Sequence, residues 1–157
     1  MKKILTLPTV IVFLITILFA GACSPVPPKG PKKVTIYLKA KKINGEKHLR
    51  MYDSNNPGNK VIDTLETLVN PGDTVVWKLK FLSRIKEIDK IGPKATGKII
   101  NKDAEKIPHT KEFKLIIPVD APIPSEREKY DIKFKYKDGR IWTIDPYLRI
   151  PRQSGGG

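Results

Sequence analysis

The side chains that most often carry out chemistry in proteins are scarce in this chain. The single cysteine is Cys23, and the two histidines are His48 and His109. A thiolate can act as a nucleophile or a metal ligand, and an imidazole can act as a general base or a metal ligand. A Ser-His-Asp or Cys-His arrangement would have to use one of these histidines, and the sequence has no Gly-x-Ser-x-Gly motif to accompany them.

A metal site would have to be built from His48, Met51 and His109. His48 and Met51 are three residues apart and resemble a pair of soft-metal ligands, whereas His109 lies far along the chain. Such a small set rarely fixes a transition metal, and the neighbouring basic residues Lys47 and Arg50 repel a cation. We therefore expect neither a metal site nor a cofactor. If the protein did bind a metal ion, His48, Met51 and His109 would be the candidate ligands.

Two pairs of carboxylates are the remaining candidates for catalysis. Glu126 with Glu128, or Asp138 with Asp145, would supply the acid and the base that a glycosidase needs. In a chain with 30 Lys and Arg against 16 Asp and Glu, the simpler interpretation is that they are ion-pair partners and turn formers. The sequence thus predicts that the protein is not an enzyme, with an envelope hydrolase built on a carboxylate pair as an alternative.

The surroundings of Cys23 indicate an export signal. The chain begins with the basic Met1–Lys3, continues with an almost uninterrupted apolar run over residues 4–19, and reaches the cysteine through the small residues 20–22. A basic start, a short apolar stretch and a small-residue exit are typical of a secretory signal peptide. The run is near the lower limit for crossing a bilayer, which favours a cleaved signal over an uncut membrane anchor.

This N-terminal pattern resembles that of bacterial lipoproteins, although Ala20 stands where an aliphatic residue such as leucine is commoner. The resemblance implies that residues 1–22 are removed and that Cys23 receives the fatty acids, such as palmitate, that hold the mature chain to a membrane. Ser24, rather than aspartate, follows the cysteine, as in lipoproteins that are passed on to the outer membrane. The expected location is therefore the outer membrane, with the protein facing the periplasm.

Three further segments follow the signal. Residues 23–33 contain four prolines and three lysines without apolar periodicity, which predicts an extended tether that spans roughly 30 Å. Residues 34–150 have a normal size for one domain that buries a single core. Residues 151–157 are expected to be a disordered tail.

The net charge of +14 could favour nucleic acid, anionic glycans or a membrane surface as the partner. The distribution of the lysines argues against nucleic acid, because they alternate with apolar residues and no aromatic residues lie between them to stack on bases. Lysines on exposed strand faces also prevent the edge-to-edge pairing of sheets. We therefore expect no nucleic-acid partner.

Alternation of apolar and polar residues is the main signal for the fold. Four long strands are predicted, at residues 34–41, 74–81, 113–119 and 130–137, and shorter ones at residues 48–52, 63–69, 85–91 and 97–101. No segment keeps a 3.6-residue apolar period over three turns, so helices should be few and short. The pattern predicts an all-β, antiparallel sandwich in which each sheet has one dry face and one lysine-rich face.

Two details of the strand pattern concern aromatic side chains. In the strand at residues 74–81, the alternation places Trp77 and Phe81 on the inward face. After the strand at residues 130–137, Asp138–Gly139 is a two-residue hairpin turn, and Trp142 should face inward on the return strand. The sequence thus assigns all three aromatic rings to the inward faces of the sheets.

The segment Val69–Trp77, in which Pro-Gly-Asp precedes a strand that contains a tryptophan, resembles the turn and strand of cupredoxins. The resemblance implies a Greek-key β-sandwich in which that tryptophan packs between the sheets, and an immunoglobulin-like sandwich is the alternative. It does not extend to the copper site, because Tyr136 occupies the position of the cysteine ligand and the following loop, Lys137–Arg140, has neither histidine nor methionine. The expectation is a cupredoxin-like domain without copper.

Two irregular segments, at residues 91–108 and 118–124, are candidates for a recognition surface, because loops gather at the ends of such sandwiches. The sequence as a whole predicts a lipid-anchored binding or structural module of the bacterial envelope. Its expected partners are the membrane, through the lipid on Cys23, and a protein of the envelope, met through sheet edges or end loops. A metal carrier of degenerate cupredoxin type and the envelope hydrolase are the alternatives.

Overall fold

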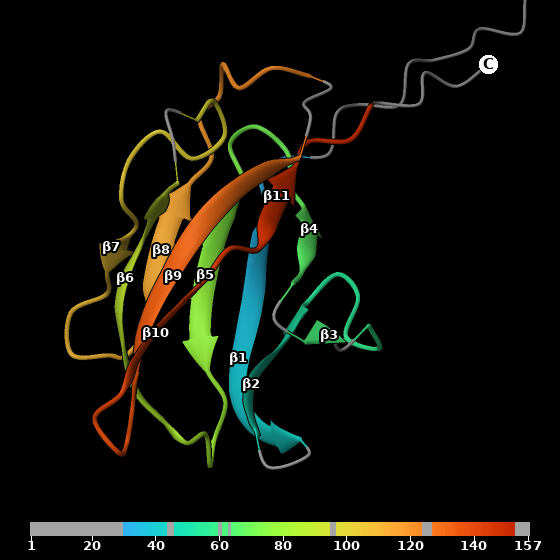
Figure 1. Cartoon of the computed structure of the whole chain (residues 1–157). Helices are drawn as coiled ribbons and strands as arrows, with labels where there is room; N and C mark the ends of the chain where they lie inside the picture. The colour runs from blue at the N-terminus through green and yellow to red at the C-terminus, as the bar shows by residue number, and fades with distance from the viewer. Residues whose placement is uncertain are drawn as a thin grey trace, which may run out of the picture. The chain divides into compact units, whose positions relative to one another are not determined.

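The computed structural model describes residues 30–43, 46–59, 61–62, 64–94, 97–123 and 127–152. This part of the chain is all-β and forms two facing sheets (Figure 1). Within these ranges there is no helix, and therefore none long and apolar enough to cross a membrane. The predicted signal peptide, Cys23, Glu126 and the C-terminal tail from residue 153 lie outside the described residues.

The strands follow one another without intervening helices in the described ranges. They are β1 (Lys33–Ile43), β2 (Glu46–Asp53), β3 (Val61–Ile62), β4 (Glu66–Leu68), β5 (Thr74–Leu79), β6 (Ile85–Pro93), β7 (Glu105–Lys106), β8 (Phe113–Ile116), β9 (Glu128–Tyr136), β10 (Ile141–Ile144) and β11 (Tyr147–Arg149). One sheet has the order β3-β2-β1-β5-β8-β7. The other has the order β10-β9-β11-β4, with β6 also paired to β9.

Most neighbouring strands pair antiparallel, as the sequence predicts, but each sheet also contains a parallel pair. β1 lies parallel to β5, and β4 lies parallel to β11. The prediction of an all-β sandwich is confirmed, while the sheets are mixed rather than purely antiparallel. β1 and β5 can run parallel because β2, β3 and β4 lie between them in the chain. These strands return the chain to the end of the sandwich at which β1 begins, so that β5 starts there as well.

The predicted strand at residues 97–101 is a loop in the structure. The backbone N–H groups of Lys98 and Ile99 donate to Glu128 Oε2 over 2.8 and 3.1 Å, and that of Ile100 donates to Glu128 Oε1 over 2.8 Å. These N–H groups therefore bind a side chain instead of a neighbouring strand. The apolar residues that suggested a strand, Ile99 and Ile100, still pack into the core.

The core lies between the two sheets. Trp77 on β5 and Tyr130 on β9 are fully buried, and their rings meet edge to face with centroids 5.6 Å apart. Burial raises the pKa of the Tyr130 hydroxyl well above its ordinary value, so this group stays protonated. The buried hydrophobic residues among those described all lie between Val34 and Ile150, so this segment encloses its own core and has the organisation of a self-contained folding unit.

The Pro-Gly-Asp turn fixes the start of β1 to the start of β5. The buried carboxylate of Asp73 accepts the Lys32 N–H at Oδ1 over 2.9 Å and the Asn70 N–H at Oδ2 over 2.8 Å. Gly72 has a φ of +82°, a conformation that favours glycine, and its N–H donates to the Ile117 carbonyl over 3.0 Å. Each residue of this motif thus has a structural role at the beginning of β5.

The two ends of the sandwich carry different segments. We call the end where β1 and β5 begin, near Lys32 and Asp73, the proximal end, and the end with the β5–β6 turn and the β9–β10 hairpin the distal end. β1 and β5 run side by side from the pair Lys33 and Thr74 onward, so the chain enters β1 at the proximal end and β5 leads to the distal end (Figure 1). The β5–β6 turn therefore lies opposite the point where the chain enters the domain.

Candidate binding surface

The β5–β6 turn presents two large apolar side chains to solvent. Phe81 is 85% exposed and Leu82 is 76% exposed. The Ser83 N–H donates to the Lys80 carbonyl over 3.1 Å and closes a four-residue turn with Phe81 and Leu82 at its two central positions. The prediction that Phe81 faces inward was wrong, because β5 ends at Leu79 and the turn begins at the next residue.

The backbone of Leu82 adopts a conformation that leucine rarely takes. Its φ is +59°, in the left-handed region, and a residue with positive φ at this position of a turn is usually Gly or Asn. Burial of the side chain does not offset this strain, because the side chain is exposed. Neither core packing nor turn geometry accounts for a leucine at this position.

The base of the turn is bonded to β1. The Lys80 N–H donates to the Leu38 carbonyl over 2.9 Å. The buried hydroxyl of Ser83 accepts the Ala40 N–H over 3.3 Å and the Ile85 N–H over 3.2 Å. None of these bonds uses the two apolar side chains, so the turn presents both of them from a fixed base.

Basic residues from three segments surround the turn. The Lys137 N–H, in the β9–β10 hairpin, donates to the Arg84 carbonyl over 2.9 Å, and Lys111 Nζ, before β8, donates to the Lys86 carbonyl over 3.2 Å. A cleft of about 350 Å³ opens between these segments. Its lining includes Phe81, Leu82, Lys78, Lys80, Lys111 and Lys137. We call these six residues, together with Arg84, the basic tip.

The surroundings of Lys78 and Lys80 favour their charged forms. Lys78 Nζ lies 2.6 Å from Glu112 Oε1, and this hydrogen bond raises the pKa of Lys78 above its ordinary value. A hydrogen bond to the Tyr52 hydroxyl raises the pKa of Lys80, whose ammonium also lies 4.9 Å from the ring centroid of Tyr37. Among the described residues that line the cleft, Glu112 is the one acidic side chain, so the surface keeps an excess of positive charge.

This combination of side chains can hold an anionic partner that also has an apolar part. Sequence reasoning did not find the surface, although one signal was present. Phe81 continues the alternation of the preceding strand, but Leu82 breaks it as a second apolar residue directly after Phe81. Lys111 and Lys137 lie far along the chain, so no local pattern could have joined them to this turn.

The two irregular segments expected to form a recognition surface contribute no described residue to the lining of this cleft. β6 extends the predicted strand to Pro93 and pairs with β9 along its length, so the first segment begins inside a sheet. The second segment follows Ile117, whose N–H donates to the Asp73 carbonyl over 2.8 Å, and therefore lies at the proximal end. Its Val119 is 83% exposed.

The structure does not bring the candidate metal ligands together. His48 and Met51 lie on β2, but three residues apart on a strand they point to opposite faces, and Met51 is buried in the core. His109 lies in the β7–β8 connection at the other side of the same sheet, where it has a φ of +59° in a turn that follows Pro108. Within the described ranges, no three His, Cys, Asp or Glu side chains group closely enough to hold one metal ion.

The candidate carboxylate pairs are engaged in other contacts or fall outside the described residues. Glu126 is not among the described residues, and Glu128 accepts the backbone N–H groups of the loop at residues 98–100. Asp138 pairs with Arg140 over 3.1 Å in the β9–β10 hairpin, whereas Asp145 lies at the other end of β10. No observation here favours the hydrolase or the metal carrier.

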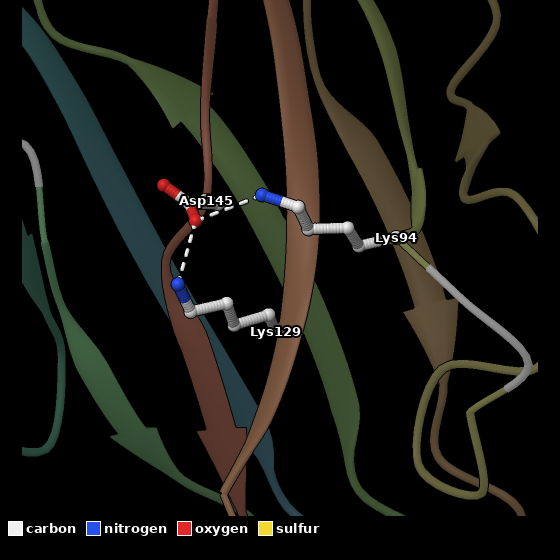
Figure 2. A network of polar contacts seen from close by, with 3 residues as sticks. All are labelled: Lys94, Lys129 and Asp145. Atoms are coloured by element: carbon white, nitrogen blue, oxygen red, sulfur yellow. Dashed lines mark hydrogen bonds and ion pairs between the residues drawn. The ribbon is translucent and has the colours of Figure 1, made fainter.

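Asp145 lies between two lysines (Figure 2). Its Oδ2 accepts a hydrogen bond from Lys129 Nζ over 2.9 Å and another from Lys94 Nζ over 3.0 Å. These bonds, the one from Lys129 foremost, hold the pKa of Asp145 below its ordinary value, and the same bond raises the pKa of Lys129. The cluster links the end of β6, β9 and the β10–β11 connection. We interpret it as an ion-pair network that supports the sheet.

Neither a known protein family nor a curated protein matches this chain. Its function therefore has to be argued from the basic tip and from the N-terminal sequence.

Proposed function

We propose that the protein is a lipid-anchored, non-catalytic binding module of the bacterial cell envelope and that it binds through the basic tip. The observation that carries this proposal is the pair of exposed apolar side chains, Phe81 and Leu82, at the apex of a turn surrounded by lysines. The lipid on Cys23, the removal of residues 1–22 and a location in the outer membrane facing the periplasm rest on the N-terminal sequence pattern.

A binding role explains two residues that the fold does not need. A leucine with positive φ costs about 1 kcal/mol of stability relative to a residue that tolerates this conformation. An exposed phenylalanine next to it adds apolar surface that favours aggregation unless another molecule covers it. Backbone strain and exposed apolar groups that persist together on a bonded base are typical of a functional surface.

The position of the basic tip suits a module that is anchored by its N-terminal side. The chain enters β1 at the proximal end, and the basic tip lies at the distal end. A lipid on Cys23, followed by the predicted tether of residues 23–33, would hold the domain by its proximal end and leave the basic tip open to a partner. That partner is a component of the envelope, either a protein, as the sequence predicts, or the membrane surface itself.

We also propose that the sandwich is cupredoxin-like and lacks the copper site. Support comes from the Pro-Gly-Asp turn that opens β5 and from Trp77, which is fully buried between the sheets as the resemblance implies. Tyr136, at the position of the cysteine ligand, is a buried core residue at the end of β9. An immunoglobulin-like sandwich stays the alternative.

Site-specific photo-crosslinking in intact bacteria tests the binding role. A photoreactive amino acid replaces Phe81 in the full chain, and the same amino acid replaces Lys114, on the outer face of β8, in a control. We expect a discrete adduct from position 81, none from position 114, and loss of the adduct when Cys23→Ser removes the anchor. Equal adducts from both positions, or none from position 81, would contradict a binding role of the basic tip.

A further inference from the structure

We propose that the basic tip docks on a bilayer surface that contains anionic phospholipids, with Phe81 and Leu82 entering the headgroup region and the lysines facing the phosphates. This names the partner of the surface described above, and it therefore rests on the proposed function.

The shape of the basic tip suits a lipid surface. Phe81 and Leu82 sit at the apex of a turn, and their high exposure means that the rest of the domain covers neither of them. Apolar side chains that project in this way can enter the boundary between headgroups and acyl chains, which adapts to their shape. A protein partner would have to offer a matching pocket for both side chains.

The type of cation also favours lipid over protein. The cleft is lined by four lysines, Lys78, Lys80, Lys111 and Lys137, of which Lys78 is paired with Glu112. Lysine is depleted in protein–protein interfaces, where arginine and aromatic residues are enriched. Near an anionic bilayer each lysine contributes about fivefold to the affinity and needs no partner in a fixed position, because the headgroups are mobile.

The arrangement of the basic tip lets the apolar and cationic groups act together. Lys78 and Lys80 precede the apex on the same chain segment, whereas Lys111 and Lys137 come from two other segments beside it. Trp142 on β10, which follows the distal hairpin, is 42% exposed, and tryptophan is enriched at membrane interfaces. Because the lysines come from three chain segments around the apex, insertion of Phe81 and Leu82 would bring several positive charges to the phosphates at once.

The proximal end offers a natural comparison. Val119 is about as exposed as Phe81, but its chain neighbours, Pro118 and Asp120, carry no positive charge. If exposed apolar surface alone caused membrane binding, both ends would contribute. If the apolar apex and the lysines act together, Phe81 contributes and Val119 does not.

The test uses residues 24–157 as a soluble protein, because the core described here lies between Val34 and Ile150. Binding is measured by co-sedimentation with vesicles of phosphatidylcholine, alone or with increasing amounts of phosphatidylglycerol. We expect binding that rises steeply with the anionic fraction and weakens at high salt, because salt screens charges beyond a few ångströms. The fluorescence of Trp142 should shift to shorter wavelength on binding, while that of the buried Trp77 stays constant.

Matched variants separate the apolar and cationic contributions. Phe81→Ser should bind anionic vesicles about tenfold more weakly, whereas Val119→Ser should bind as the unchanged protein does. Lys80→Gln and Lys137→Gln should each bind about fivefold more weakly. Lys98→Gln, at an exposed position of the proximal end, is the control for the same loss of charge. Thermal unfolding verifies that each variant is folded.

Three results would overturn the proposal: no binding to anionic vesicles, equal binding to neutral and anionic vesicles, or unchanged binding by Phe81→Ser. The photo-adduct from position 81 in cells then distinguishes a failure of the lipid partner from a failure of the binding role of the basic tip. An adduct with a protein alone would preserve the binding module and replace its lipid partner by a protein. The absence of any adduct would contradict the binding module itself.

Discussion

A buried hydrogen bond joins Trp77 on β5 to Tyr130 on β9, with Trp77 Nε1 donating to Tyr130 Oη over 3.0 Å. The two residues are 53 positions apart in the chain and lie in different sheets. Because both side chains are fully buried, water cannot replace either partner. The bond helps to fix one sheet against the other, and so the β5–β6 turn against the β9–β10 hairpin that flanks it.

Tyr130→Phe should lower the free energy of unfolding by about 1–3 kcal/mol, because it leaves the Trp77 N–H buried without an acceptor. Chemical denaturation followed by fluorescence measures the change. Tyr37→Phe is the matched control, since the Tyr37 ring stacks on Tyr52 at the sheet surface with centroids 5.0 Å apart, and it should change stability by less than about 0.5 kcal/mol. Equal effects of the two substitutions would show that the buried hydrogen bond does not contribute to the free energy of unfolding beyond what an exposed hydroxyl does.

Asp73→Ala should cost about 2 kcal/mol or more, because the buried carboxylate accepts the N–H groups of Lys32 and Asn70 and both would lose their acceptor. Urea denaturation provides the measurement. Asp120→Ala removes an exposed carboxylate at the same end of the domain and should leave stability nearly unchanged. A small effect at Asp73 would mean that the turn does not depend on its carboxylate.

Leu82→Gly should raise the free energy of unfolding by about 1 kcal/mol, because glycine tolerates the positive φ of this position. The same variant should weaken binding through the basic tip, so stability and binding should change in opposite directions. Phe81→Gly removes a similar exposed side chain from a position without positive φ, and it should weaken binding without any gain in stability. Thermal unfolding decides between these outcomes, and a loss of stability in Leu82→Gly would contradict the strain assigned to this residue.

Asp145→Asn should flatten the acid dependence of stability. The pKa of Asp145 is lowered in the folded state from its ordinary value of 3.8, so its contribution to stability is present above that value and is lost as the pH falls through the lower folded-state pKa. Melting temperatures measured between about pH 2 and pH 7 test this expectation. Asp89→Asn, whose exposed carboxylate contacts Lys133 over 3.2 Å on the same sheet, is the control. If the melting temperatures of the two variants depend on pH in the same way, the Asp145 cluster contributes no more to stability than the exposed pair of Asp89 and Lys133.

The inward faces of the long strands could be predicted from the sequence, because side chains alternate along a strand with a period of two. Trp77 is buried as this period requires. Phe81 continues the same alternation, yet it lies outside the sheet. Its strand ends early because the Ser83 N–H closes a turn on the Lys80 carbonyl and the Ser83 hydroxyl accepts the Ala40 N–H of β1, and a bond between residues so far apart in the chain leaves no trace in the local pattern.

The exposed fraction of a side chain is harder to predict than the side of the sheet on which it lies. Trp142 lies opposite the buried Phe134 in the β9–β10 pair and so points to the inner side of its sheet, as predicted, but it is partly exposed because β10 is an edge strand.

The basic tip could not be predicted from the sequence, because it depends on which strands pair. Its lysines come from three separate segments, and only the pairing of β6 with β9 and of β5 with β8 brings them together.

The most direct test of the central claim, that the protein binds its partner through the basic tip, is photo-crosslinking from position 81 in intact bacteria. The account predicts a discrete adduct that depends on Cys23 and that does not form from position 114. An adduct that forms equally from both positions, or no adduct from position 81, would contradict it.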